Sequence, residues 1–261
     1  MATYSSYKQI PTDAIIDGTI SSSQLSYASS LQTWNVKWFY GNPVPLTGGC
    51  CCLWTVPSNV YRLFIEAWGS GGNGHGMCVD NRCQHYAGAG GGYYNAKSIC
   101  TCPGCQYTVC AAGVFPCCGF NCIECQGCSS YVNGYNLSNF CAIGGIGGCA
   151  NVNWNEACNS DWSCCLAPGN NGGDFSLGNH RGSFFGHGSE CHCHCFGTQP
   201  SPAPFIGTMV HQNIHECWMR CACWSVPYGH GGQGALTTYC GTTCCGQGST
   251  GGGGLVKITY I

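Results

Sequence analysis

The segment from Phe64 to Gly92 constrains this chain most, because glycine dominates it at 69–76 and again at 88–92, on both sides of a cysteine-bearing insert. A β-type run from Val60 to Trp68 leads into the segment, and another from Tyr93 to Ile99 follows it. Each glycine in a helix costs about 1 kcal/mol relative to alanine, so we expect no helix here. The segment can pack backbone against backbone, or bring its backbone close to a ligand.

Charge and hydropathy exclude several classes of function. Only 7% of the residues are charged, and the net charge is −2, which argues against nucleic-acid binding and against an electrostatic membrane anchor. No apolar run reaches the ~18–20 residues that a membrane span needs. The first eight residues, Met-Ala-Thr-Tyr-Ser-Ser-Tyr-Lys, form no apolar signal core, so we expect no passage through a secretion channel.

The cysteine content conflicts with the expectation that the chain is not secreted. The chain holds 28 cysteines in 261 residues, above the ~8–10% that marks a disulfide scaffold, although cytosolic proteins rarely keep disulfides. One resolution is a protein that is made in the cytoplasm and works outside the cell after lysis, as a virion component does. The other is metal ligation by reduced thiolates.

Short β-type runs separated by glycine-rich turns extend along the chain, with no convincing helix. This pattern predicts an all-β fold: a glycine-rich β-sandwich or jelly-roll-like domain with long, irregular, disulfide-linked loops. The expected strands are Leu31–Phe39, Cys50–Pro57, Val60–Trp68, Tyr93–Ile99, Gln106–Ala112, Ser129–Val132, Phe140–Ile143, Asp174–Leu177 and Leu255–Tyr260.

The first 30 residues differ from the rest, because the leader is rich in Ser and Thr and no cysteine precedes Cys50. We expect two parts: residues 1–30 as an extended arm that docks on a neighbouring subunit or virion protein, and residues 31–261 as the glycine- and cysteine-rich β domain. The alternative is a floppy terminus. The apolar residues of the arm, which need a surface to cover, are Ile10, Ile15, Ile16, Ile20 and Leu25.

Most of the cysteines are expected in disulfides, whose connectivity the sequence does not give. The candidates are Cys50, Cys78, Cys83, Cys100, Cys102, Cys105, Cys110, Cys117, Cys118, Cys141, Cys149, Cys158, Cys217, Cys221, Cys240 and Cys244. Two clusters also have metal-ligand spacing and are weak candidates for a metal site: Cys122, Cys125 and Cys128, and Cys191, Cys193 and Cys195. We predict no cofactor.

No catalytic set emerges, since carboxylates are few and the glycine run lacks the Lys-Ser/Thr of a phosphate-binding loop. Aromatic residues in or near glycine loops are the better binding candidates, because exposed rings stack on sugars and anchor protein interfaces. They can equally fill the core of a domain that has few other large residues. The candidate receptor contacts are Tyr94, Tyr135, Trp154, Trp162, Phe184 and Phe185.

The order of these pieces resembles the glycine-rich domain of tailed-bacteriophage fibre and tail-tip proteins. The matching motifs are Glu66-Ala-Trp-Gly-Ser-Gly-Gly72, Gly90-Gly-Gly-Tyr-Tyr94, the Pro103-Gly104 turn with its following strand to Gly113, and the final Gly251–Ile258 run. The leader from Ile10 to Ile20 is similar to virion-attachment segments of marine cyanophage structural proteins. The high cysteine content departs from the common family members.

The resemblance implies a structural virion protein, not an enzyme: a small tail-fibre, tail-tip or capsid-decorating subunit on the virion surface. It implies a homo-oligomer, with a trimer favoured, that contacts other virion proteins and has a host receptor or glycan as a further candidate partner, with neither nucleic acid nor membrane insertion. Two alternatives stay open. One is an extracellular filament or coat protein cross-linked by disulfides, and the other is a Cys/His metal-binding module.

Overall fold

The structure, a computed structural model, divides the chain into two compact units: Met1–Asn35 together with Ile261, and Val36–Tyr260. Apart from Asn35, all the residues that it describes belong to the second unit, and the expected domain boundary at residue 30 lies outside them. The described residues are 35–42, 49–74, 77–79, 91–114, 126–147, 172–178, 184–185, 197–198, 203–206, 228–232, 244–246 and 249–260.

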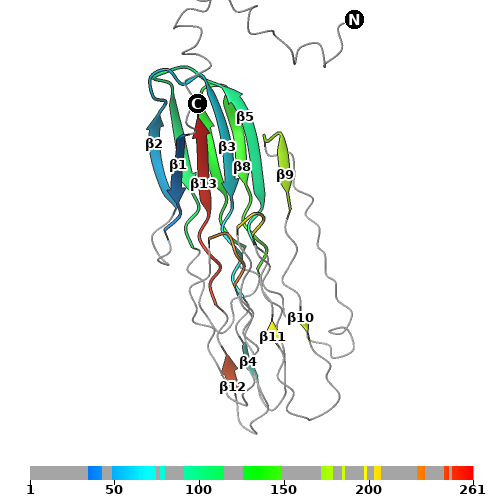
Figure 1. Cartoon of the computed structure of the whole chain (residues 1–261). Helices are drawn as coiled ribbons and strands as arrows, with labels where there is room; N and C mark the ends of the chain where they lie inside the picture. The colour runs from blue at the N-terminus through cyan, green and yellow to red at the C-terminus, as the bar shows by residue number, and fades with distance from the viewer. Residues whose placement is uncertain are drawn as a thin grey trace, which may run out of the picture. The chain divides into compact units, whose positions relative to one another are not determined.

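The described residues form an all-β fold, as the sequence predicts (Figure 1). They contain no helix, and therefore no helix that could cross a membrane. The larger sheet has the order β1 (Asn35–Tyr40), β13 (Leu255–Tyr260), β3 (Arg62–Trp68), β5 (Tyr94–Cys100) and β9 (Phe175–Leu177). The pairs β13·β3, β3·β5 and β5·β9 are antiparallel.

The second sheet has four strands in the order β2 (Cys50–Thr55), β6 (Gln106–Ala111), β7 (Ser130–Gly134) and β8 (Leu137–Ala142), all antiparallel. Two short ladders were not expected from the sequence, because runs of two or three residues carry no readable period. They pair β4 (Met77–Val79) with β12 (Cys244–Gly246), and β10 (Phe184–Phe185) with β11 (Gly197–Thr198). The jelly-roll connectivity stays a prediction.

The two sheets share one apolar core. In β3, the alternate residues Leu63, Ile65 and Ala67 are fully buried, as their spacing predicts for one face of a strand. They pack in the same cluster as Tyr107 of β6 and Phe140 of β8, which come from the other sheet. This shared core makes the nine strands of the two sheets a β-sandwich.

Beyond the strand ends, glycine segments lie side by side and bond to one another through their backbones (Figure 1). In the segment that follows β3, three successive amides donate to three different neighbours: Gly69 to the Tyr93 carbonyl at 3.0 Å, Ser70 to Cys128 at 3.0 Å and Gly71 to Gly252 at 2.8 Å. A β-strand has neighbours only in the plane of its sheet, so this segment belongs to a bundle and not to a sheet.

Two of these segments are joined by hydrogen bonds at an interval of three residues. Gly71 donates to Gly252, and Gly74 donates to Ser249 at 2.9 Å, so a step of three residues along one segment matches a step of three along the other. A polyproline II chain has three residues per turn and no internal hydrogen bonds, so its amides and carbonyls point outward in three directions. The two bonds between residues 71–74 and 249–252, which run antiparallel, have the three-residue spacing expected of such chains packed side by side.

We name these segments, residues 69–74, 91–93, 126–128, 143–147, 228–232 and 249–254, the glycine bundle. Its segments approach too closely to admit side chains: a Cβ added at Gly71 would overlap the His230 carbonyl, and one at Gly92 would overlap the Gly69 carbonyl. Of the two possibilities that the sequence left open, packing of backbone against backbone is therefore the one found.

Candidate functional site

The outer face of the five-stranded sheet carries the largest group of exposed rings among the described residues. Because Leu63, Ile65 and Ala67 point into the core, the intervening residues of β3 point outward, and the neighbouring strands follow the same alternation. We call this surface the aromatic face; its exposed members are Val36, Trp38, Tyr40, Phe64, Phe175 and Phe205, and the half-buried Tyr228 and the buried Trp68 and Tyr94 pack against them.

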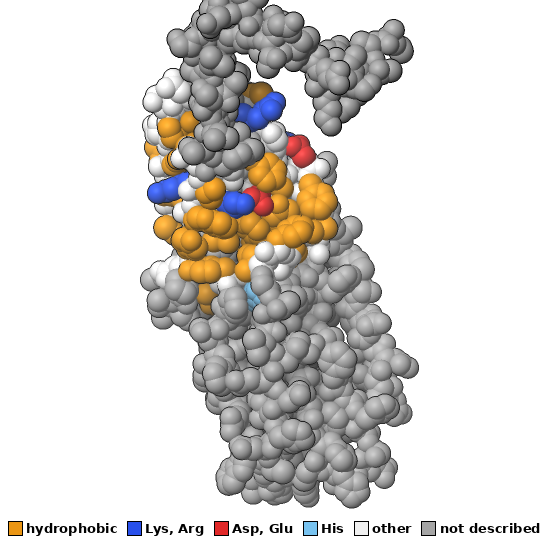
Figure 2. All heavy atoms as spheres, viewed as in Figure 1, with side chains coloured by type: hydrophobic (Ala, Val, Ile, Leu, Met, Phe, Trp, Pro, Cys, Tyr) orange, Lys and Arg blue, Asp and Glu red, His pale blue; other side chains and the backbone are white. Residues whose placement is uncertain are grey.

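The rings of the aromatic face form a continuous series of contacts across the strands. Trp38 stacks on Tyr40 and on Trp68, with centroid distances of 6.4 Å in both cases. Tyr94 contacts Trp68 at 5.0 Å and Phe205 at 5.0 Å. Phe205 is 72% exposed and Tyr40 is 51% exposed, so rings at both ends of the series meet solvent. Figure 2 shows apolar side chains gathered over this side of the molecule.

A charged pair lies within the aromatic face. Lys257 Nζ lies 2.6 Å from Glu66 Oε2 and 5.5 Å from the centre of the Trp38 ring, a cation–π contact. The Tyr94 hydroxyl donates to Glu66 Oε1 at 3.0 Å. Burial raises the pKa of Tyr94 well above its usual value, and the neighbouring Glu66 charge raises it further, so this phenol stays a hydrogen-bond donor.

Tyr94 was expected to contact a receptor, but only 4% of it is exposed, which corrects that expectation. Its ring packs beneath Phe205 and against Trp68, so it supports the surface without forming it. Tyr135, in the β7–β8 turn, is 50% exposed. Trp154 and Trp162 lie outside the described residues, as do the side chains of Phe184 and Phe185, whose backbone forms β10.

Sequence reasoning missed Trp38, Tyr40 and Phe205 as surface residues. The first two had a readable signal, because they alternate with Lys37 and Phe39 in a strand and so share one face. Phe205 had none, since it follows Pro204 in an irregular segment and adopts a positive φ of 60°.

Two disulfides lie within the described residues, and three of their four cysteines, Cys102, Cys105 and Cys110, were predicted to form disulfides. Cys51 of β2 and Cys110 of β6 are directly opposite in the ladder and are bonded. Cys102 and Cys105 are bonded across the Pro103-Gly104 turn. Cys51 had not been named as a candidate.

Other predicted disulfide cysteines carry free thiols instead. Cys50, Cys100 and Cys141 are unbonded, because the residues opposite them in the ladders are Ala111, Arg62 and Tyr131. The remaining disulfide candidates lie outside the described residues, apart from Cys78 and Cys244, of which only the backbone is described.

Cys52 and Cys128 are also free. Burial raises the pKa of Cys52 and of Cys141, and for Cys52 the nearby Cys50 adds to the effect. Of the six metal candidates only Cys128 is described, and the described residues contain no cluster of three or more potential metal ligands. The docking-arm residues from Ile10 to Leu25 lie outside the described part of the chain.

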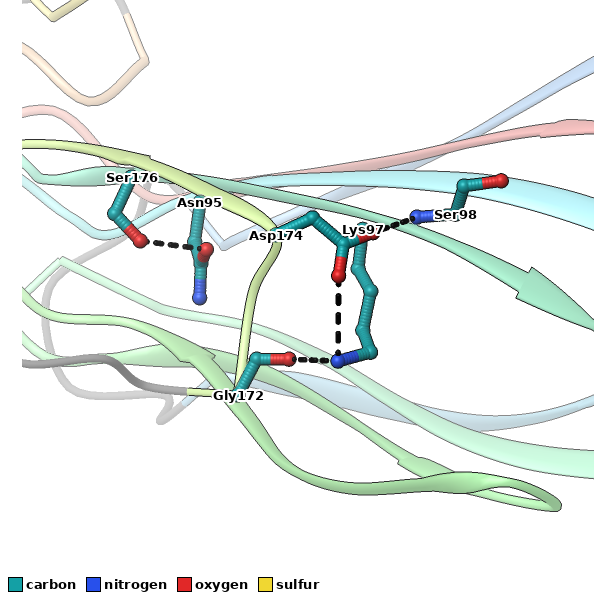
Figure 3. Close-up of polar contacts among 6 residues, drawn as sticks. All are labelled: Asn95, Lys97, Ser98, Gly172, Asp174 and Ser176. Atoms are coloured by element: carbon teal, nitrogen blue, oxygen red, sulfur yellow. Dashed lines mark hydrogen bonds and ion pairs between the residues drawn. The ribbon is translucent and has the colours of Figure 1, made fainter.

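A polar cluster fixes β9 to the edge of the larger sheet (Figure 3). Lys97 Nζ donates to the Gly172 carbonyl at 2.6 Å and lies 3.6 Å from Asp174 Oδ1. Asp174 Oδ2 accepts from the Ser98 amide at 2.9 Å, and Ser176 Oγ donates to Asn95 Oδ1 at 2.9 Å. Each group already has a partner from this chain, which favours a structural role for the cluster.

Comparison with known proteins adds no family: no protein-family model matches the chain, and neither does any curated protein.

Proposed function

We propose that this chain is a structural virion protein of a tailed bacteriophage, a small tail-fibre, tail-tip or capsid-decorating subunit at the virion surface. The observation that carries the proposal is the glycine bundle. Its segments are joined by direct backbone hydrogen bonds such as Gly229 N to Gly253 O at 2.7 Å and Gly252 N to His230 O at 2.7 Å. Because the backbones of this bundle pack directly against one another, with no space for a Cβ at Gly71 or Gly92, the arrangement favours a structural role.

The aromatic face supplies the contact surface in this proposal. Trp and Tyr are enriched among the residues that dominate binding energy at interfaces, and exposed aromatic rings also stack on sugar rings. The Lys257–Glu66 pair lies among them and offers polar partners without adding net charge. We assign this face to contacts with other virion proteins or with a host receptor, and we propose a homo-oligomer, with a trimer favoured.

Location on particles tests the proposal. Antibodies raised against the purified chain should label density-purified phage particles from lysed cultures, at the tail end or over the capsid, in immunogold electron microscopy. If the antibodies label cell-bound filaments and leave the particles unlabelled, the result contradicts the proposal. It then favours the alternative of an extracellular filament or coat protein.

A truncation tests the arm separately. Full-length chain should join particles during assembly, whereas a chain lacking residues 1–30 should stay in the soluble fraction. Equal incorporation of both chains would end the docking-arm hypothesis and leave the location on particles unaffected.

A further inference from the structure

The turn between β5 and β6 brings together a disulfide and a free thiol. Cys102 and Cys105 are bonded to each other, and Cys100, at the end of β5, is free and exposed. The two residues between the bonded cysteines are exposed, and the bonded cysteines are themselves half-buried. Thr101 is buried and its hydroxyl bonds to the Tyr107 hydroxyl at 2.8 Å, which fixes the base of the turn.

The turn does not depend on its disulfide. Pro103 and Gly104, with Gly104 at a φ of 78°, are the residues that a type II turn favours at its two central positions. The Cys105 amide closes the turn on the Cys102 carbonyl at 3.1 Å, and the Gly104 amide donates to the Val56 carbonyl at 3.0 Å. Opening the disulfide therefore leaves the backbone in place, so the bond can break and re-form without refolding.

The disulfide between Cys51 and Cys110 is less suited to exchange than the one in the turn. Cys110 is only 3% exposed, so attack at Cys51 would release a thiolate into an apolar setting, where burial disfavours the charged form. Either sulfur of the Cys102–Cys105 bond can leave as a partly hydrated thiolate. The rate of exchange depends on how accessible the attacked sulfur is and on how readily the other sulfur leaves as a thiolate. Both conditions favour the Cys102–Cys105 disulfide over the Cys51–Cys110 disulfide.

We propose that the turn of residues 100–105 is a thiol–disulfide exchange site that joins two copies of this chain covalently. The Cys100 thiol of one copy loses its proton to solvent, and the thiolate attacks Cys102 Sγ of the other copy. A bond forms between these two sulfurs, the Cys102–Cys105 bond breaks, and Cys105 leaves as a thiolate that takes up a proton. No oxidant is consumed, because one disulfide replaces another.

A second copy is the fitting partner because each copy carries both reactants on the same exposed turn. A twofold contact at this turn places each Cys100 near the disulfide of the other copy, so one surface serves both roles. The inference does not depend on the phage proposal, since it requires only two copies of the chain.

Mixing of isotope-labelled and unlabelled chains tests the exchange. The two full-length chains, with native disulfides, are mixed without oxygen near pH ~8, where thiolate is available, and are then quenched with an alkylating agent. Peptide mass spectrometry under non-reducing conditions should find mixed-isotope peptides that join Cys100 to Cys102 or Cys105. C100S should lower their yield at least about tenfold, and so should alkylation of exposed thiols before mixing.

C50S is the matched control, because Cys50 is also an exposed free thiol beside a disulfide cysteine. It should leave the yield of these mixed-isotope peptides unchanged. The proposal is overturned if no mixed-isotope peptide contains Cys100, if Cys100 pairs only within its own chain, or if C50S lowers the yield as much as C100S does.

Discussion

At the scale of single residues, Glu66 connects the aromatic face to its polar contacts. One oxygen accepts from the Tyr94 hydroxyl and the other pairs with Lys257, while both partners also touch rings of the face. The Glu66 carboxylate is largely buried, and its charge is stabilised by Tyr94 and Lys257. Removing either partner leaves this charge without enough polar contacts. The face therefore depends on a small polar group within it.

Replacing Tyr94 tests this dependence. Y94F should lower the free energy of unfolding near neutral pH by about 1.5–3 kcal/mol, the range for a hydrogen bond to a charged group. The matched control is Y61F, since Tyr61 is 62% exposed and should tolerate loss of its hydroxyl. Urea unfolding followed by tryptophan fluorescence measures both; equal effects would contradict the role of Tyr94.

The raised pKa of Tyr94 predicts that the free energy of unfolding depends on pH in the alkaline range. Burial, with the Glu66 charge, raises its pKa in the folded chain above the value of 10.0 expected when unfolded. The folded state then holds this proton longer than the unfolded state, so its contribution to stability is complete below pH 10 and is lost as the pH rises further. The alkaline fall in unfolding free energy should be shallower in Y94F; an identical fall would exclude Tyr94 as a source.

The burial of Tyr94 shows what the sequence around a single residue could not predict. The sequence places Tyr93 and Tyr94 after glycine, and that position is typical of an exposed loop ring or of a core ring. The difference is decided by Phe205, more than a hundred positions later, whose ring packs against Tyr94. No local pattern carries such information.

At the scale of elements, strands with a two-residue period could be predicted and the pairing between them could not. The alternation in Val60–Trp68 correctly indicated the buried side of β3. The partner strands β13 and β5 come from distant parts of the chain, and register follows from packing after the sheet forms. The same argument applies to disulfides: Cys51 bonds to Cys110 because the β2–β6 register places them opposite.

The two described disulfides should differ in their effect on stability. A cross-link stabilises mainly by restricting the unfolded chain, more so for longer loops. The Cys51–Cys110 bond spans 59 positions and the Cys102–Cys105 bond spans 3. Alanine at both Cys51 and Cys110 should cost about 4 kcal/mol, and alanine at both Cys102 and Cys105 about 2 kcal/mol. Denaturant unfolding of the two double variants measures the difference; a larger loss at the turn would contradict this account.

At the scale of the described unit, two kinds of packing hold the chain together. The sandwich is held by buried side chains such as Tyr107 and Phe140, whereas the segments of the glycine bundle are joined mainly by backbone hydrogen bonds. Two of its buried side chains also bond to the backbone: Asn73 Oδ1 accepts from the Gly251 amide at 3.0 Å, and Ser70 Oγ accepts from the Cys128 amide at 2.6 Å. The sequence indicated close backbone contact but not which segments meet, because glycine carries no side-chain pattern to match.

One pair of variants tests the glycine bundle most directly. At Gly71 a Cβ would overlap the His230 backbone, whereas at Gly253 the nearest atom to an added Cβ, the Gly41 carbonyl oxygen, lies at an ordinary 3.4 Å. The measurement is the free energy of unfolding of G71A and G253A against the parent chain. We predict a loss of more than about 3 kcal/mol for G71A and a change within about 1 kcal/mol for G253A. Equal, small effects at both positions would contradict packing of backbone against backbone as the basis of this structure.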